Sequence, residues 1–226
     1  MRLQFALLIT LAAGSVAFAR NKTAERLDDA ADVMKEIMDT SDKGIPQDLL
    51  NKAQCIIVVP GLKKGAFILG GKYGKGFVNC RKPGGEGWTA PAAIRVEGGS
   101  VGFQIGGSET DVVMLVMNER GMKKLLTSKF TLGGEGEVAA GPVGRDASAQ
   151  TDALLHAEML SWSRTRGAFA GISLQGATLR EDSDDNKEMY GQPYANADIL
   201  KGTIATPEAA QKLNSLLDKY SPKKVS

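Results

Sequence analysis

The stretch "PGLKKGAFILGGKYGKGFVNCRKPGG", residues 60–85, decides the fold that we expect for this chain. Its short runs of β-branched and aromatic residues are separated by glycines, a pattern typical of antiparallel strands joined by tight turns. Similar runs follow as far as about Leu179. Because glycine weakens the interior of a strand, so many glycines indicate bulges, tight bends or close backbone approach. The pattern predicts a strongly curved, glycine-rich antiparallel sheet or a barrel-like core.

Helical patterns flank this region on both sides. Residues 23–39 place their apolar side chains on one helical face, and their polar face is mostly acidic. Anionic lipid would repel that polar face, so we expect this helix to pack on the protein's own core. Residues 206–220 form an apolar stripe with Thr206 as the expected cap and Pro207 at the first helical position. We therefore expect one α+β domain with helices from both termini packed on the sheet.

The N-terminal segment "MRLQFALLITLAAGSVAFA", residues 1–19, has the layout of a secretory signal peptide. Arg2 precedes an apolar core, and small residues stand at Ala17 and Ala19. We predict cleavage after Ala19, which leaves residues 20–226 as a single exported domain. The protein would then be periplasmic or secreted and peripheral to a membrane. The alternative is a buried N-terminal helix.

The two cysteines, Cys55 and Cys80, both fall in expected strands. In an oxidising compartment they could form a disulfide, and the alternative of two buried thiols stays open at this point. One histidine and two cysteines are too few for a convincing zinc site, so we expect no metal and no cofactor.

The basic residues of the opening stretch are the main functional candidates. No acidic residue occurs between Asp48 and Glu86. The spacing of the glycines fits neither a P-loop nor a dinucleotide-binding fingerprint. A local positive field instead attracts anionic headgroups, and each basic residue near such a surface contributes about 1 kcal/mol. The predicted headgroup contacts are Lys63, Lys64, Lys72, Lys75, Arg81 and Lys82.

Two further features qualify this prediction. Apolar residues at the expected turns, Leu62, Phe67 and Phe77, could add shallow insertion into the membrane. The alternative is that the lysines are only solvated side chains on turns. The chain has 28 basic and 26 acidic residues, and this near-neutral balance argues against nucleic-acid binding.

A possible catalytic motif is "GGSVG", residues 98–102, which would make Ser100 a nucleophile. Asp111 or Asp146 and the single histidine, His156, follow in the chain order of an α/β-hydrolase. That motif must join a strand to a helix, whereas the sequence after it continues as a strand. We therefore interpret Ser100 as a residue beside a hairpin turn and keep a serine hydrolase as a lesser alternative.

Several long blocks, taken in order, resemble the SYLF domain family of lipid-binding proteins between Ala53 and Gly191. They are "KGAFILGGKYGKGFVNCR", "GWTAPAAIRVEGGSVGFQIGGSETDVVMLVMN", "KFTLGGEGEVAAGPVGR" and "SRTRGAFAGISLQGATL". The resemblance implies a membrane-lipid-binding module rather than an enzyme. Eukaryotic members bind phosphoinositides, and some fungal members also bind actin. A signal peptide followed by a lone SYLF domain resembles the bacterial branch, whose members are presumed to be periplasmic or secreted.

The same blocks draw attention to three arginines, Arg145, Arg164 and Arg166. An arginine in an apolar, glycine-rich setting needs a partner, because an unpaired buried charge is costly. It would either pair internally, with Asp111 or Asp152, or hold a lipid phosphate, and internal pairing is the usual outcome.

The sequence therefore favours non-enzymatic binding of anionic phospholipids, with phosphoinositide-like headgroups, at a membrane of the cell envelope. An alternative from another class is a structural module of the envelope that pairs its sheet edges with a protein partner.

Overall fold

The computed structural model describes residues 21–40, 44–66, 70–100, 106–133, 137–143, 157–165, 168–172 and 174–223. The expected signal peptide, residues 1–19, lies outside these ranges, and so do Phe67, Arg145, Arg166 and His156.

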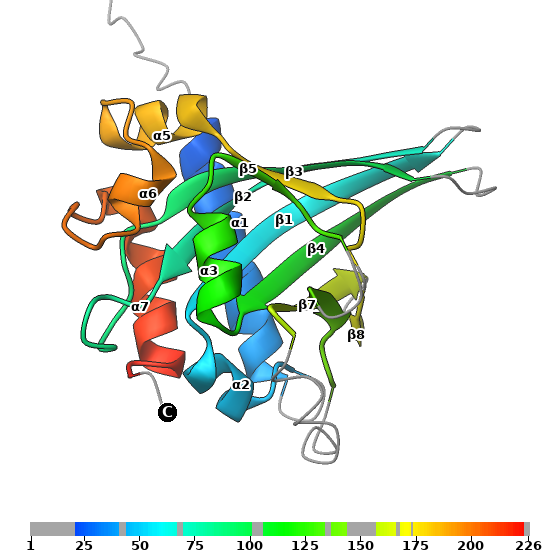
Figure 1. Ribbon diagram of the computed structural model, residues 1–226, viewed down its shortest axis with the longest axis horizontal. Helices are drawn as coiled ribbons and strands as arrows, with labels where there is room; N and C mark the ends of the chain where they lie inside the picture. The colour runs from blue at the N-terminus through cyan, green and yellow to red at the C-terminus, as the bar shows by residue number, and fades with distance from the viewer. Residues whose placement is uncertain are drawn as a thin grey trace, which may run out of the picture.

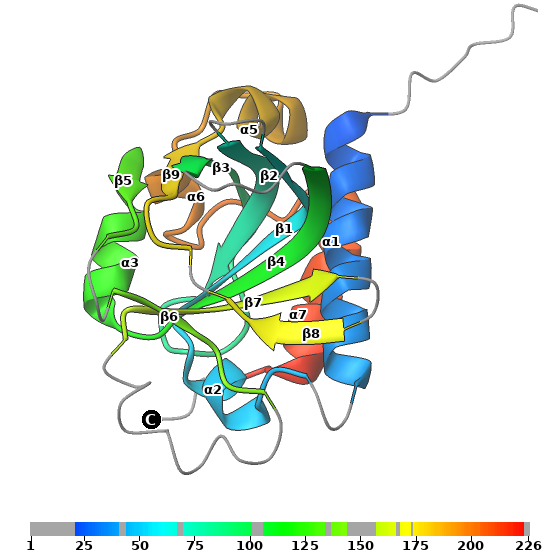
Figure 2. The same cartoon turned by 90° about the vertical axis from the view of Figure 1, so that its right-hand side faces the viewer.

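The core of the molecule is one sheet of nine strands, in the order β5-β9-β3-β2-β1-β4-β7-β6, with β8 also paired to β7. The strands are β1 (Cys55–Ala66), β2 (Gly70–Cys80), β3 (Ala92–Ser100), β4 (Gly106–Val116), β5 (Lys129–Thr131), β6 (Val138–Ala140), β7 (Met159–Thr165), β8 (Ala168–Gly171) and β9 (Thr178–Glu181). The sheet curls into a half-barrel (Figure 2). The predicted fold is confirmed, although the sheet is mixed, because β6 and β7 run parallel.

The helices lie on both faces of the sheet (Figure 1). They are α1 (Lys22–Asp39), α2 (Gln47–Lys52), α3 (Glu119–Leu125), α5 (Ser183–Tyr190), α6 (Asn196–Ile199), the 3-10 turn η2 (Glu208–Ala210) and α7 (Gln211–Tyr220). Of the helices in the described ranges, none is both long and apolar enough to span a membrane.

Two separate cores follow from the alternation of side chains along the central strands. Ile56 and Val58 of β1 belong to the core that includes the apolar residues of α1 and α7. Ile57 and Val59, the alternate residues, belong to a second core with Leu125 of α3 and other residues. We call the two sides of the sheet the α1 face and the α3 face.

The helix ends are close to those expected. The Asn21 side chain caps α1 by accepting hydrogen bonds from the amides of Thr23 and Ala24. The Asn118 side chain caps α3 by accepting a hydrogen bond from the amide of Gly121. Thr206, however, does not cap a helix: Pro207 keeps an extended backbone at the N-cap of η2, so the C-terminal helical segment starts one residue later than expected.

A disulfide joins Cys55 and Cys80, which are directly opposite each other in the β1–β2 ladder. This resolves the choice between a disulfide and free thiols that the sequence left open. The bond ties together the end of the hairpin at which β1 begins and β2 ends.

Candidate functional site

The four central strands extend beyond the helices as a projecting arm (Figure 1). We define the arm as residues 62–66, 70–74, 97–100 and 106–110. It begins at an irregularity in β1, where the pairing register shifts between Val58 and Lys63. Gly61 lies within this shift and has a φ of 59°, a left-handed backbone that favours glycine. The bulge therefore marks the boundary between the packed body of the sheet and the arm.

A row of glycines crosses all four strands of the arm. Gly65 is paired with both Gly71 and Gly107, and Gly71 is paired with Gly99. A Cβ atom added to Gly65 or Gly99 would have no heavy atom within 4 Å. Neither packing nor a left-handed backbone requires glycine here. The row instead leaves bare backbone at the surface of the arm.

Two lysines lie directly opposite each other next to this row. Lys64 of β1 is paired with Lys72 of β2, and their outer neighbours in the same row are Ser108 and Gly98. Residues opposite each other on neighbouring strands share a face, so both ammonium groups lie on the α3 face, which is also the face of Leu62. Like charges in this position are destabilising. Burial lowers the pKa of Lys72, and the positive charge of Lys64 lowers it further.

The adjacent row has a different character. It lies on the α1 face and pairs Lys63 with Tyr73 on one side and Glu109 on the other. Glu97 completes the row beside Tyr73. Tyr73 is 49% exposed, and among the described residues it is the one large hydrophobic side chain at the surface. The lysine pair on the α3 face thus has no acidic neighbour in its row, whereas Lys63 has one.

The other three basic residues predicted to contact headgroups lie elsewhere. Lys75 forms ion pairs of 2.8 Å with both Asp182 and Asp185 near the start of α5. Burial opposes its charge, but these hydrogen bonds outweigh burial and raise the pKa of Lys75. Arg26 of α1 also pairs with Asp185. Lys75 is therefore part of an internal ion-pair cluster and is not free for a ligand.

Arg81 is buried and holds the C-terminal end of the chain. Its guanidinium donates hydrogen bonds to the carbonyl oxygen and the hydroxyl of Ser221, and it stacks 3.9 Å from the ring centre of Trp88. Burial lowers its pKa to about 10. A headgroup could not reach this side chain without displacing Ser221. Lys82, two residues after the end of β2, is exposed at the opposite end of this strand from Lys72.

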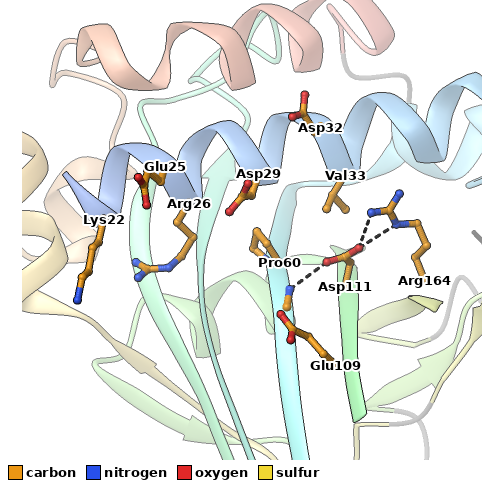
Figure 3. Close-up of a pocket in the computed structure, with 11 residues that line it drawn as sticks. Lys22, Glu25, Arg26, Asp29, Asp32, Val33, Pro60, Glu109, Asp111 and Arg164 are labelled. Carbon is orange, nitrogen blue, oxygen red and sulfur yellow. Dashed lines mark hydrogen bonds and ion pairs between the residues drawn. The ribbon is translucent and has the colours of Figure 1, made fainter. Parts of the chain in front are cut away.

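Arg164 of β7 pairs internally, as expected. Its Nε and Nη2 atoms lie 2.8 and 2.7 Å from Oδ2 of Asp111, and it also contacts Glu36 of α1. The amide of Gly61 donates a hydrogen bond of 2.9 Å to the other oxygen of Asp111. Figure 3 shows Asp111 and Arg164 facing each other below Val33 of α1. This interaction joins the bulge of β1 to β4, β7 and α1.

The Asp111–Arg164 pair lines a pocket of about 580 Å³ between α1 and the sheet (Figure 3). Its acidic lining residues, Glu25, Asp29, Asp32, Glu109 and Asp111, outnumber its basic ones, Lys22, Arg26 and Arg164. This excess of negative charge does not suit an anionic headgroup. The pocket therefore does not provide the lipid site that the sequence predicts.

Ser100 does not lie in the context that a hydrolase nucleophile requires. It is the last residue of β3, paired with Gly70, and the next described strand is β4. Of its proposed partners, Asp111 is held by Arg164 and Gly61. Asp146 and His156 lie outside the described residues. The next element among the described residues is a strand, whereas the motif requires a helix after the strand.

Comparisons with known proteins agree with the resemblance found in the sequence. The model of the Ysc84 family, described as "Las17-binding protein actin regulator", matches residues 97–220. SH3 domain-containing YSC84-like protein 1 of Xenopus laevis is 37% identical over 201 residues, which cover 86% of this chain and 59% of that protein. The human protein of the same name is 32% identical, with 86% of this chain and 58% of that protein covered.

In a fungal relative, the match covers a smaller share of the protein. Protein YSC84 of Saccharomyces cerevisiae is 33% identical over 183 residues, which cover 79% of this chain and 38% of that protein. The chain spans about 59% of the length of the vertebrate relatives that it matches.

Proposed function

This chain belongs to the Ysc84 family, the family of the SYLF domain, and on that premise we propose that it binds anionic phospholipids at a membrane surface without catalysis. The observation that carries the proposal is the Lys64–Lys72 pair at the surface of the arm. Two like charges directly opposite each other cost stability unless an anion lies between them. A phosphate that bridges the two ammonium groups would remove this repulsion.

The surroundings of the pair suit a lipid headgroup. Ser108 offers a hydroxyl in the same row, and the glycine row leaves the backbone open beside it. No side-chain partner of Lys64 or Lys72 is found within the described residues. On the opposite face of the arm, Tyr73 has an apolar ring with a polar tip, a combination that favours the boundary between lipid and water.

The structure leaves fewer apolar residues for insertion into a membrane than the sequence predicts. Leu62 and Phe77 are buried in the two cores and cannot enter a membrane. Phe67 belongs to the link between β1 and β2, which reads Phe-Ile-Leu, and it lies outside the described residues. Shallow insertion by this link stays a prediction. The electrostatic proposal now rests on the Lys64–Lys72 pair and excludes Lys75 and Arg81, whereas Lys63 lies on the opposite face beside Glu109.

The test is co-sedimentation of the purified protein with vesicles of graded phosphatidylglycerol or phosphoinositide content in phosphatidylcholine. At about 1 kcal/mol for each basic residue, Lys64→Gln/Lys72→Gln should weaken binding about 30-fold. Lys35→Gln/Lys187→Gln is the matched control, because both lysines are exposed and lie outside the arm. Binding should fall between 0.1 and 1 M salt, as the Debye length shrinks from about 10 Å to 3 Å.

Equal binding by the two double variants would contradict the proposal. Phosphoinositide vesicles that bind no better than phosphatidylglycerol at equal charge would show that charge density, and not the inositol headgroup, is recognised.

We also propose that residues 20–226 form one domain, exported by the signal peptide 1–19 to act at an envelope membrane. The support is the sequence layout alone. Mass spectrometry of the protein recovered from its native cells should find Arg20 as the first residue. A chain that keeps Met1 and stays in the cytoplasm would contradict export.

A second candidate function is strand pairing with a protein partner. In β3, Gly99–Ser100 lie beyond the residues that pair with β9, and in β4, Gly106–Glu109 lie beyond the residues that pair with β7. On these outer sides, neither segment has a strand partner among the described residues. An open edge can accept an added strand. Such binding uses backbone groups, so it would survive both high salt and Lys64→Gln/Lys72→Gln.

A further inference from the structure

Lys82 lies beside a second pocket, distant from the arm. This pocket has a volume of about 520 Å³, within the range of about 300–1,000 Å³ typical of small-molecule sites. It lies between the link that follows β2, helix α3 and the end of α6. Its lining includes Arg81, Lys82, Met122, Leu126, Ala197, Leu200 and Lys201.

The lining of this pocket is mainly apolar. Met122 and Leu126 are only partly buried, although they pack against the core of the α3 face, and Leu200 forms part of that core. The two partly buried side chains therefore offer apolar surface that the fold itself does not cover. An apolar ligand could bury this surface, which is the main favourable term in binding to such pockets.

Every charged residue of the lining is basic. Arg81 donates hydrogen bonds to Ser221, and Lys201 pairs with Asp198 at 2.7 Å. Lys82 is exposed and has no side-chain partner within the part of the chain that the structure describes. It is therefore the cation available to a ligand at the rim.

We propose that this pocket binds a single-chain anionic amphiphile, such as a fatty acid or a lysophospholipid. The acyl chain would lie against Met122, Leu126 and Leu200, and the carboxylate or phosphate would contact Lys82. A purely polar anion would leave the apolar lining in water, and a neutral chain would make no use of Lys82. This site is independent of the membrane-binding arm.

The test is isothermal titration of the purified protein with decyl phosphate, decanoate and the neutral decyl maltoside, each below its micelle concentration. Both anions should bind more tightly than the maltoside. Each methylene removed between the decyl and octyl compounds should weaken binding about three- to fourfold. Preference for the carboxylate would indicate a fatty acid, and preference for the phosphate a lysophospholipid; either result supports the site.

Three variants locate the binding. Lys82→Glu should weaken the anions about three- to tenfold and leave the maltoside unchanged. Lys187→Glu, the same charge change on an exposed residue of α5, should alter neither. Ala197→Trp should block all three compounds by filling the pocket, with a denaturation curve to check that it folds.

Absence of binding by both anions would overturn the proposal, as would binding that does not depend on chain length. If the maltoside bound as tightly as the anions and Lys82→Glu had no effect, the proposal that the ligand needs an anionic head would be overturned. Lys64→Gln/Lys72→Gln should still bind decyl phosphate, so failure of the arm proposal and of this one can be distinguished.

Discussion

The body and the arm of the central sheet are built from the same four strands but use glycine for opposite reasons. In the body, a Cβ atom added to Gly76 would lie 2.1 Å from the carbonyl oxygen of Val58, so only glycine fits there. In the arm, a Cβ atom added to Gly65 would meet nothing within 4 Å. Glycine lets the body curl tightly, whereas the row of Gly65, Gly71, Gly99 and Gly107 leaves that part of the arm bare. Closer to the body, Gly74 and Gly98 are again crowded, by Leu62 and Ala177.

The lysines of β2 show the same contrast. Lys72 and Lys75 are three residues apart, yet Lys75 is neutralised by two carboxylates and Lys72 faces another lysine. A basic run in a sequence is therefore not one surface. The charge of Lys75 helps to hold the fold together, whereas the fold does not use the charges of Lys64 and Lys72.

The largest expected effect tests the two kinds of glycine. Gly76→Val should lower the free energy of unfolding by about 4 kcal/mol, because its side chain must displace backbone atoms of β1. Gly71→Val should change it by less than about 1 kcal/mol, because the nearest atom to its Cβ is a carbonyl oxygen at 4.0 Å. Urea denaturation of both variants measures the difference. Similar losses in the two would show that the arm is packed.

The disulfide should be needed by the body and not by the arm. The bond spans a sequence separation of 25 residues. Its removal in Cys55→Ala/Cys80→Ala should cost about 3 kcal/mol, mainly through the freedom gained by the unfolded chain. Vesicle binding of the folded variant should be unchanged. Weaker binding at a temperature where circular dichroism shows a folded protein would mean that the bond also positions the arm.

The two lysines of β2 should separate stability from binding. Lys75→Gln should lower the free energy of unfolding by about 1 to 2 kcal/mol, because Asp182 and Asp185 lose a partner, and it should leave vesicle binding intact. Lys72→Gln should weaken vesicle binding about fivefold and keep or slightly raise stability, since a repulsion is removed. Chemical denaturation and co-sedimentation of both variants test this. The opposite assignment would place the headgroup at Lys75.

The smallest effect concerns pH. Burial and the charge of Lys64 lower the pKa of Lys72 below the ordinary lysine value of 10.5. A lysine loses its charge as the pH rises through its pKa, so vesicle binding should begin to weaken below pH 10.5. In Lys72→Gln this early decrease should be absent. An identical pH profile for the two proteins would show that Lys72 does not contribute.

Those features of the fold that depend on neighbouring residues could be predicted from the sequence. The period of apolar residues located α1, and glycine-punctuated runs located β1 to β4. Strands β7 and β8 also fall within the predicted series of strands that ends near Leu179. The parallel pairing of β6 could not be predicted, because no local pattern of three residues specifies its partner.

The site could be predicted only in part, because the fate of each cation depends on distant residues. The sequence places six basic residues, Lys63, Lys64, Lys72, Lys75, Arg81 and Lys82, in one stretch without acidic residues. It does not show that Lys63 lies beside Glu109, on the opposite face from Lys64 and Lys72. It does not show that Asp182 and Asp185, more than a hundred residues later, meet Lys75. Nor does it show that the guanidinium of Arg81 donates hydrogen bonds to Ser221. The acidic run at residues 181–186 was the one signal in the sequence for the partners of Lys75, because a cluster of carboxylates is stabilised by a nearby cation.

The contact between α1 and α7, two helices that are far apart in the sequence, has a consequence for how the protein folds. α1 packs on α7, with Lys212 2.9 Å from Asp32 and the hydroxyl of Tyr220 2.9 Å from Asp39. Helix α1 thus completes its packing only after α7 has emerged from the ribosome or crossed a membrane. Contacts between such distant residues slow folding. We therefore expect a chain truncated before Gln211 to collapse without reaching a native state, and the longer chain to stay open to proteases until α7 has docked on α1.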